Sequence, residues 1–159
     1  MNRSRMHRIV EKIPVFKGLS TAQVQKVLDI CSERHFRMGQ RVCGEGDESS
    51  EFFVVLSGVL EVRTSAGVAL AAIRRMSVVG EMGMLTGRPR SAAVSAIADT
   101  TVLRIGGDDL DRVIDGDKDI GLHVYRNLAQ ILCDRLRSSN AYLEQFFFTV
   151  EELSAKSPE

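Results

Sequence analysis

The sequence predicts an α+β, mainly β domain, built as an antiparallel jelly-roll-like β-barrel flanked by N-terminal helices and a long C-terminal helix. Apolar residues recur at helical spacing near the N-terminus. Short apolar runs separated by glycine-containing turns follow, as in a small antiparallel barrel or sandwich. Farther on, apolar residues repeat in heptads. These three patterns divide the chain into an N-terminal helical segment, a β-barrel, C-terminal helices and a tail, at residues 1–38, 39–106, 107–148 and 149–159.

Composition restricts the class of protein. The chain has 159 residues, of which 44% are hydrophobic, enough for one domain with a core. The 21 Lys and Arg residues balance 21 Asp and Glu residues, which argues against attraction of the whole molecule to nucleic acid or acidic membranes. No apolar run reaches the roughly 18 residues of a membrane span, and no signal-peptide apolar region follows the N-terminus. We therefore expect a cytoplasmic protein.

Three cysteines, Cys31, Cys43 and Cys133, lie far apart in the chain. Their odd number and wide spacing favour neither a disulfide framework nor a clustered metal site. The three histidines lie on separate predicted elements, so a metal-dependent barrel enzyme lacks support, and no nucleophile motif is present. We expect a protein that is not an enzyme and holds no metal.

The N-terminal segment is expected to be helical. A first helix stops or kinks at Pro14, because proline lacks the amide N–H that a helix interior requires. A second helix is predicted to begin after Ser20, a good N-cap residue. Apolar residues then recur every three or four positions, at Val24, Val27, Leu28 and Cys31.

The strands are predicted from short apolar runs. Residues 52–56 and 59–62 flank Ser57-Gly58, which is the shortest hairpin signal in the chain. A second turn at 65–67 leads to a run over 68–73. Runs over 92–97 and 101–105 complete the predicted sheet.

Acidic clusters at 108–109 and 115–119 bracket a short predicted helix. They are read as helix caps or solvated surface, because the closing Glu of a calcium-binding loop is missing.

The last and longest predicted helix runs from about Lys118 to Phe146. Its heptads place Leu122, Ala129, Leu136 and Leu143 at one apolar position, and Tyr125, Leu132, Ser139 and Phe146 at the other. This pattern suits a two-stranded coiled coil, and so a homodimer. The alternative is a helix that packs on its own barrel.

Residues 80–94 carry the candidate chemistry. Gly80-Glu81 would open a one-turn helix, whose first backbone N–H groups can bind an anionic oxygen. Arg90 supplies a planar fork of donors suited to phosphate, with the Ser91 hydroxyl beside it. The Glu81 carboxylate can accept a hydrogen bond from a sugar hydroxyl. From the residues alone, a loop in which Arg90 and Glu81 pair with each other is an equal alternative.

The residues Gly80-Glu81-Met82-Gly83-Met84-Leu85, followed by Arg88 to Ala96, resemble the phosphate-binding cassette of cyclic nucleotide-binding domains. Upstream, Glu45-Gly46-Asp47 resembles that family's Glu-Gly-Asp turn, and the run 52–58 resembles its strand ending in glycine. Phe16 to Leu19 adds a third match. The resemblance covers roughly residues 13–145, and it is specific because spaced motifs agree in order and distance.

The resemblance implies roles for these residues. Glu81 would bind the ribose 2′-hydroxyl and Arg90 the cyclic phosphate. Ser91, Gly83 and the backbone near Gly80, Met82 and Ala92 would complete the phosphate site. An Arg135-Leu136 pair is similar to one in the dimer helix of the family's transcription factors, which places Ser139 and Asn140 where the base is contacted.

Two positions depart from the family pattern. Met76 stands where the family has a glycine, and Val79 where it has an aromatic residue. Because methionine avoids positive φ, we expect the loop before the cassette to take another shape, with a lower affinity.

We therefore expect a stand-alone cyclic nucleotide sensor that binds cyclic AMP in preference to cyclic GMP and needs no other cofactor. Only 13 residues follow Phe146, with no room for a DNA-reading helix. The signal would pass through the C-terminal helix and Phe146-Phe147-Phe148 to a protein effector. The alternative is a domain that keeps the fold, no longer binds nucleotide, and serves in dimerisation or docking.

Overall fold

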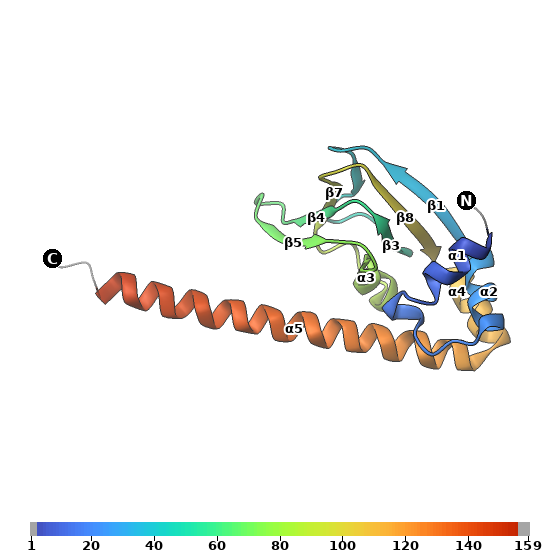
Figure 1. Ribbon diagram of the computed structural model, residues 1–159. Coiled ribbons are helices and arrows are strands. Elements are labelled where there is room, and N and C mark those ends of the chain that lie inside the picture. Colours follow the sequence, from blue (N-terminus) through green and yellow to red (C-terminus); the bar gives the residue numbers. More distant parts are fainter. Residues whose placement is uncertain (1–2, 156–159) are drawn as a thin grey trace.

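The computed structural model describes residues 3–155 (Figure 1). In chain order the elements are α1 (Arg3–Val10), the 3₁₀ helix η1 (Pro14–Phe16), α2 (Thr21–Ile30), β1 (Cys31–Phe36), β2 (Arg41–Cys43), β3 (Glu51–Ser57), β4 (Leu60–Arg63), β5 (Ala69–Ile73), β6 (Val78–Val79), α3 (Glu81–Thr86), β7 (Ala93–Ala96), β8 (Thr100–Gly106), α4 (Gly107–Gly116) and α5 (Lys118–Ala155).

The strands form two four-stranded sheets, with the orders β1-β8-β3-β6 and β2-β7-β4-β5, and all neighbouring strands are antiparallel. Alternate residues of β3 enter two separate cores. Phe53 and Val55 pack against the other sheet, whereas Phe52 and Val54 pack against the helices. The predicted jelly-roll-like α+β fold is confirmed, although the two sheets are not joined into a closed barrel.

The hairpin predicted at Ser57-Gly58 is wrong, because β3 and β4 belong to different sheets. Gly58 has φ +82°, and a Cβ there would overlap the Asp99 carbonyl and Thr100. The glycine therefore forms a corner that carries the chain from one sheet to the other. The true hairpin is β4–β5, in which Leu60 pairs with Ile73 across the turn at 65–67.

Helices cover one face of the first sheet. The first half of α5 runs beneath them and buries Ile120, Val124 and Leu128 completely (Figure 1). α2 begins as predicted, since the Ser20 hydroxyl accepts a hydrogen bond from the Gln23 amide and the Gln23 side chain caps Ser20 in return.

Two predicted boundaries are wrong. The helical segment ends at Ile30 rather than residue 38, because residues 31–36 form strand β1 and pair with residues 100–105 of β8. At the other end, α5 continues to Ala155, so most of the predicted 149–159 tail is helix. No proline interrupts this segment, and Glu and Leu are good helix formers. Residues 156–159 lie outside the described part of the chain.

Candidate cyclic nucleotide site

The loop from β6 to β7 holds the predicted cassette. Gly80 precedes α3 with a left-handed backbone, φ +88° and ψ 0°, and Gly87 ends the helix in a similar conformation. A Cβ at Gly80 would overlap the Arg90 guanidinium. Gly80 is therefore required both by the turn and by the close approach of Arg90.

Arg90 is 6% exposed, and the protein itself holds its guanidinium in place. Nη1 donates to the Gly80 carbonyl and Nη2 to the Glu51 carbonyl, each at 2.8 Å. The guanidinium carbon also lies 5.9 Å from the centre of the Phe53 ring. The Nε–H is also buried, and it has no acceptor. The protein thus holds the guanidinium in place but leaves its Nε–H unsatisfied.

The turn at 45–47 fixes the backbone of Arg90. The amide of Arg90 donates to the Asp47 carbonyl, and the amide of Gly46 donates to the Arg90 carbonyl, each at 2.8 Å. The Asp47 carboxylate in turn accepts from the Gly44 amide at 2.6 Å. The two motifs that are separated by about 40 residues in the sequence therefore form one unit in the fold.

Glu81 is 2% exposed and does not pair with Arg90. Its Oε1 accepts a hydrogen bond from Nη1 of Arg135 in α5 at 2.5 Å, while Nη2 of Arg135 donates to the Val78 carbonyl. The alternative in which Arg90 and Glu81 satisfy each other is wrong. No sequence motif indicates Arg135 as the partner of Glu81, although its position, seven residues after buried Leu128, places it on the face of α5 that meets the domain.

The other predicted site residues separate into two groups. Gly83 and Ala92 are buried in the cassette, while the Met82 and Ser91 side chains are exposed there. A Cβ at Gly83 would overlap the Ser49 side chain, whose buried hydroxyl has no partner. Ser139 and Asn140 are exposed on α5.

The loop before the cassette differs from expectation. Met76 has φ +68°, and among the described residues it is the one non-glycine with positive φ. Its side chain packs, half-buried, against the core beneath the helices. Met76 thus takes the positive φ that methionine was expected to avoid, and burial of its side chain offsets a backbone strain of about 1–2 kcal/mol.

Other chemistry finds little support within residues 3–155. No group of three His, Cys, Asp or Glu side chains is placed to hold a metal ion. Burial raises the pKa of the Cys31 thiol to about 12, so this sulfur is not a nucleophile near neutral pH. No helix in the described range combines the length and apolarity needed to cross a bilayer.

Curated relatives match most of this chain but only part of their own length. A cyclic AMP-dependent protein kinase regulatory subunit from Mycosarcoma maydis is 33% identical over 109 residues, 64% of this chain and 21% of that protein. Glutaminase 1 from Bradyrhizobium diazoefficiens is 31% identical over 131 residues, 82% of this chain and 21% of the enzyme. The chain thus spans about a fifth of the length of these relatives.

Solved structures share the fold. A cyclic nucleotide-binding domain from Methylobacillus flagellatus has a TM-score of 0.78 at 24% identity, over 98% of this chain and 85% of that one. The catabolite activator protein of Thermus thermophilus has a TM-score of 0.71 at 29% identity, over 85% of this chain and 63% of that one. The model of the cyclic nucleotide-binding domain matches residues 33–117, which include β3, the cassette and β8. The chain therefore belongs to the cyclic nucleotide-binding domain family.

Proposed function

We propose that the cassette binds a cyclic purine mononucleotide, cyclic AMP in preference to cyclic GMP, and that α5 relays its occupancy to a partner. The observation that carries this proposal is the unpaired Nε–H of Arg90. A buried N–H without an acceptor costs about 1–3 kcal/mol. A phosphate oxygen placed there would satisfy it with a charge-assisted hydrogen bond, on a guanidinium that two carbonyls already orient.

The sugar would bind at Glu81. Arg135 occupies Oε1 of this carboxylate, and Oε2 accepts no hydrogen bond from the described residues. A ribose 2′-hydroxyl can therefore donate to Oε2 while the Arg135 pair is kept. Because Arg135 belongs to α5, the sugar would be linked to the C-terminal helix through a single carboxylate. This link is the proposed route by which binding reaches the helix.

The partner includes a second copy of the chain. Leu122, Leu136 and Leu143, three of the predicted heptad residues, are 67%, 62% and 54% exposed. Such a stripe along one helix favours a two-stranded coil. In a parallel coil, Asn140 would lie beside Arg135 of the other copy, so the proposed base contact would come from across the dimer. Phe146 to Phe148, all exposed, would then carry the signal to a protein effector.

Calorimetric titration of the full chain with cyclic AMP and with cyclic GMP tests the binding proposal. We expect heat and a thermal shift with both, and tighter binding of cyclic AMP. Ser91 has a hydroxyl that can serve either base, so the preference depends on Asn140.

The second candidate is a fold-retaining docking module that binds no nucleotide. The Glu81–Arg135 pair favours it, because the carboxylate already has a cationic partner without ligand. If neither nucleotide produces heat or a thermal shift, this candidate is favoured over the nucleotide sensor.

Hydrogen exchange of residues 118–148, with and without nucleotide, tests the relay. Slower exchange in α5 on binding supports it, and unchanged exchange beside measurable binding would refute it.

A further inference from the structure

A cavity of about 240 Å³ opens where the cassette helix α3 meets α4 and α5. Its lining comprises Met84, Leu85, Gly107, Leu110, Asp111 and Tyr125. Most of the surface exposed inside the cavity is polar, although Met84, Leu85 and Leu110 line it. The polar side chains are the Asp111 carboxylate and the Tyr125 hydroxyl, which donates to it at 3.3 Å. Asp111 is exposed at the edge of this cavity, so its carboxylate retains room for a further donor.

Arg126 follows the cavity residue Tyr125 in α5. It is exposed, and it makes no hydrogen bond or ion pair with any described residue. Five N–H donors therefore extend from the helix beside the exposed heptad stripe. The chain thus presents an unpaired cation and an acidic cavity on neighbouring parts of one surface.

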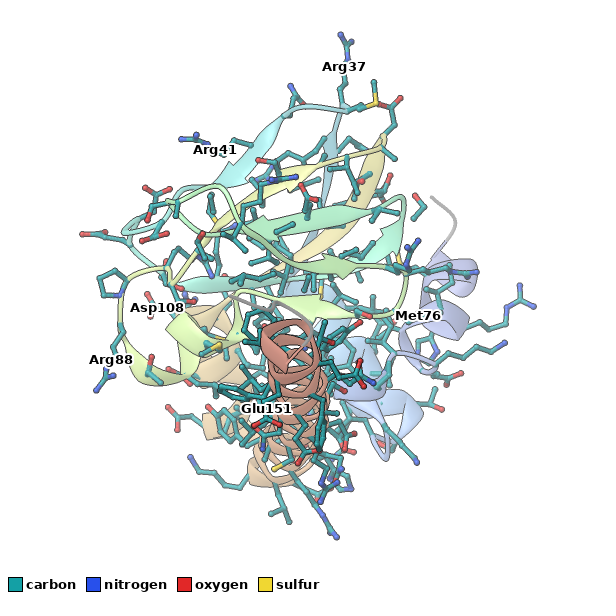
Figure 2. All side chains as sticks on the ribbon, turned by 90° about the vertical axis from the view of Figure 1, so that its left-hand side faces the viewer. Arg37, Arg41, Met76, Arg88, Asp108 and Glu151 are labelled. Carbon is teal, nitrogen blue, oxygen red and sulfur yellow. The ribbon has the colours of Figure 1, made fainter. Side chains whose placement is uncertain are left out.

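The heptad pattern of α5 assigns a position in a coiled coil to Arg126 and to the residues around it. With Leu122 at position a and Tyr125 at d, Arg126 is at e and Gly121 at g. A Cβ at Gly121 would overlap Ile114, so α4 packs directly against the g edge of α5. Farther along that edge, Arg135 binds the cassette. In the view along α5, Asp108 and Arg88 lie to one side of the helix and Met76 lies to the other (Figure 2).

We propose that Arg126 of a second copy enters this cavity and pairs with Asp111, an inference that rests on the dimer of the proposed function. In a parallel coil, an e residue faces the g residue five positions earlier on the partner. Arg126 would therefore face Gly121, which has no side chain to pair with it. α4 fills that place and supplies Asp111 as the opposite charge, and the arginine stem covers the apolar lining residues Met84 and Leu85. The interface then includes the cassette helix α3, beside the nucleotide.

Charge exchange in the full chain tests this pair by sedimentation equilibrium. Arg126→Glu and Asp111→Arg should each raise the dimer dissociation constant about tenfold, and the double variant should return it to within about threefold of the wild type. The matched control is Arg137→Glu, which reverses an exposed arginine on the outer face of α5 and should change the constant less than about twofold. Far-UV circular dichroism confirms that each variant is folded.

The orientation is tested by Leu143→Cys on a Cys133→Ser background. Two a-position sulfurs meet only in a parallel, in-register coil, so oxidation should give a cross-linked dimer. A dimer that is unaffected by either charge reversal, or that fails to cross-link, would overturn the Arg126–Asp111 pair while leaving dimerisation and nucleotide binding intact. A wild-type chain that stays monomeric would overturn both the pair and the proposed dimer, and calorimetry on the same sample still measures nucleotide binding.

Discussion

In the cassette, buried charged groups are already held by protein atoms: Arg90 by two carbonyls, and Glu81 by Arg135. In the second half of α5, over residues 136–152, every side chain is exposed, including three adjacent phenylalanines. Figure 1 shows this half of the helix extending away from the sheets. One region is thus organised before any ligand binds, whereas the other presents an apolar surface with no cover from its own chain.

This difference indicates where each region gets its stability. The cassette is fixed by hydrogen bonds to β3, to the 45–47 turn and to α5, so it should change little when nucleotide arrives. A solitary helix is marginally stable in water, and the side chains of residues 136–152 are all exposed, so little packing supports this part of α5. Its order should therefore depend on association.

The largest effect is expected from Arg90→Glu. Loss of the cation, and its replacement by an anion, should remove about 2–5 kcal/mol of nucleotide binding, or roughly 30- to several-thousandfold in affinity. Calorimetry measures this effect, and Glu81→Ala should cause a smaller loss. If Arg90→Glu binds nucleotide like the wild type while its thermal unfolding is unchanged, the cassette is not the binding site.

Arg135→Ala should destabilise the folded chain by about 3 kcal/mol, because it leaves the carboxylate of Glu81 buried and unpaired. Glu81→Ala should cost less, since Arg135 is 37% exposed and can turn to water. Urea unfolding of the two variants measures the difference. Equal losses of unfolding free energy in the two variants would contradict the expectation that an unpaired Glu81 costs more than an unpaired Arg135.

Leu143→Lys should weaken the proposed dimer at least about tenfold, or about 1.4 kcal/mol, since it places a charge in the coil seam. The cassette lies elsewhere, so nucleotide affinity per chain should fall far less. Sedimentation measures dimerisation, and Glu144→Lys, which changes the next and outward residue, is the control. The same dimer constant for both variants would exclude this seam.

The smallest effect concerns Met76. Both Met76→Ala and Met76→Gly remove the half-buried side chain, but only glycine relieves the positive φ. The glycine variant should therefore be more stable than the alanine variant by about 1 kcal/mol in chemical unfolding. An alanine variant as stable as the glycine variant would mean that Met76 carries no backbone strain.

Local patterns were sufficient for much of the fold. The runs that became β3, β5, β7 and β8, the Ser20 cap and the start of α5 follow from residue periodicity and capping chemistry, which act over a few residues. β1 was missed because its polar residues, such as Arg34 and His35, alternate poorly, and pairing with β8 rather than propensity makes it a strand.

The family and the local backbone of residues 80–90 could be predicted from the sequence, since Glu81, Arg90 and the glycines around them form a contiguous motif whose backbone needs are local. Tertiary structure decided the rest. It separated Glu81 from Arg90, paired the Glu81 carboxylate with Arg135, which lies 54 residues farther along the chain, and left Ser139 and Asn140 exposed. A buried charge takes the partner that folding brings within hydrogen-bond distance, and no short-range pattern encodes that choice.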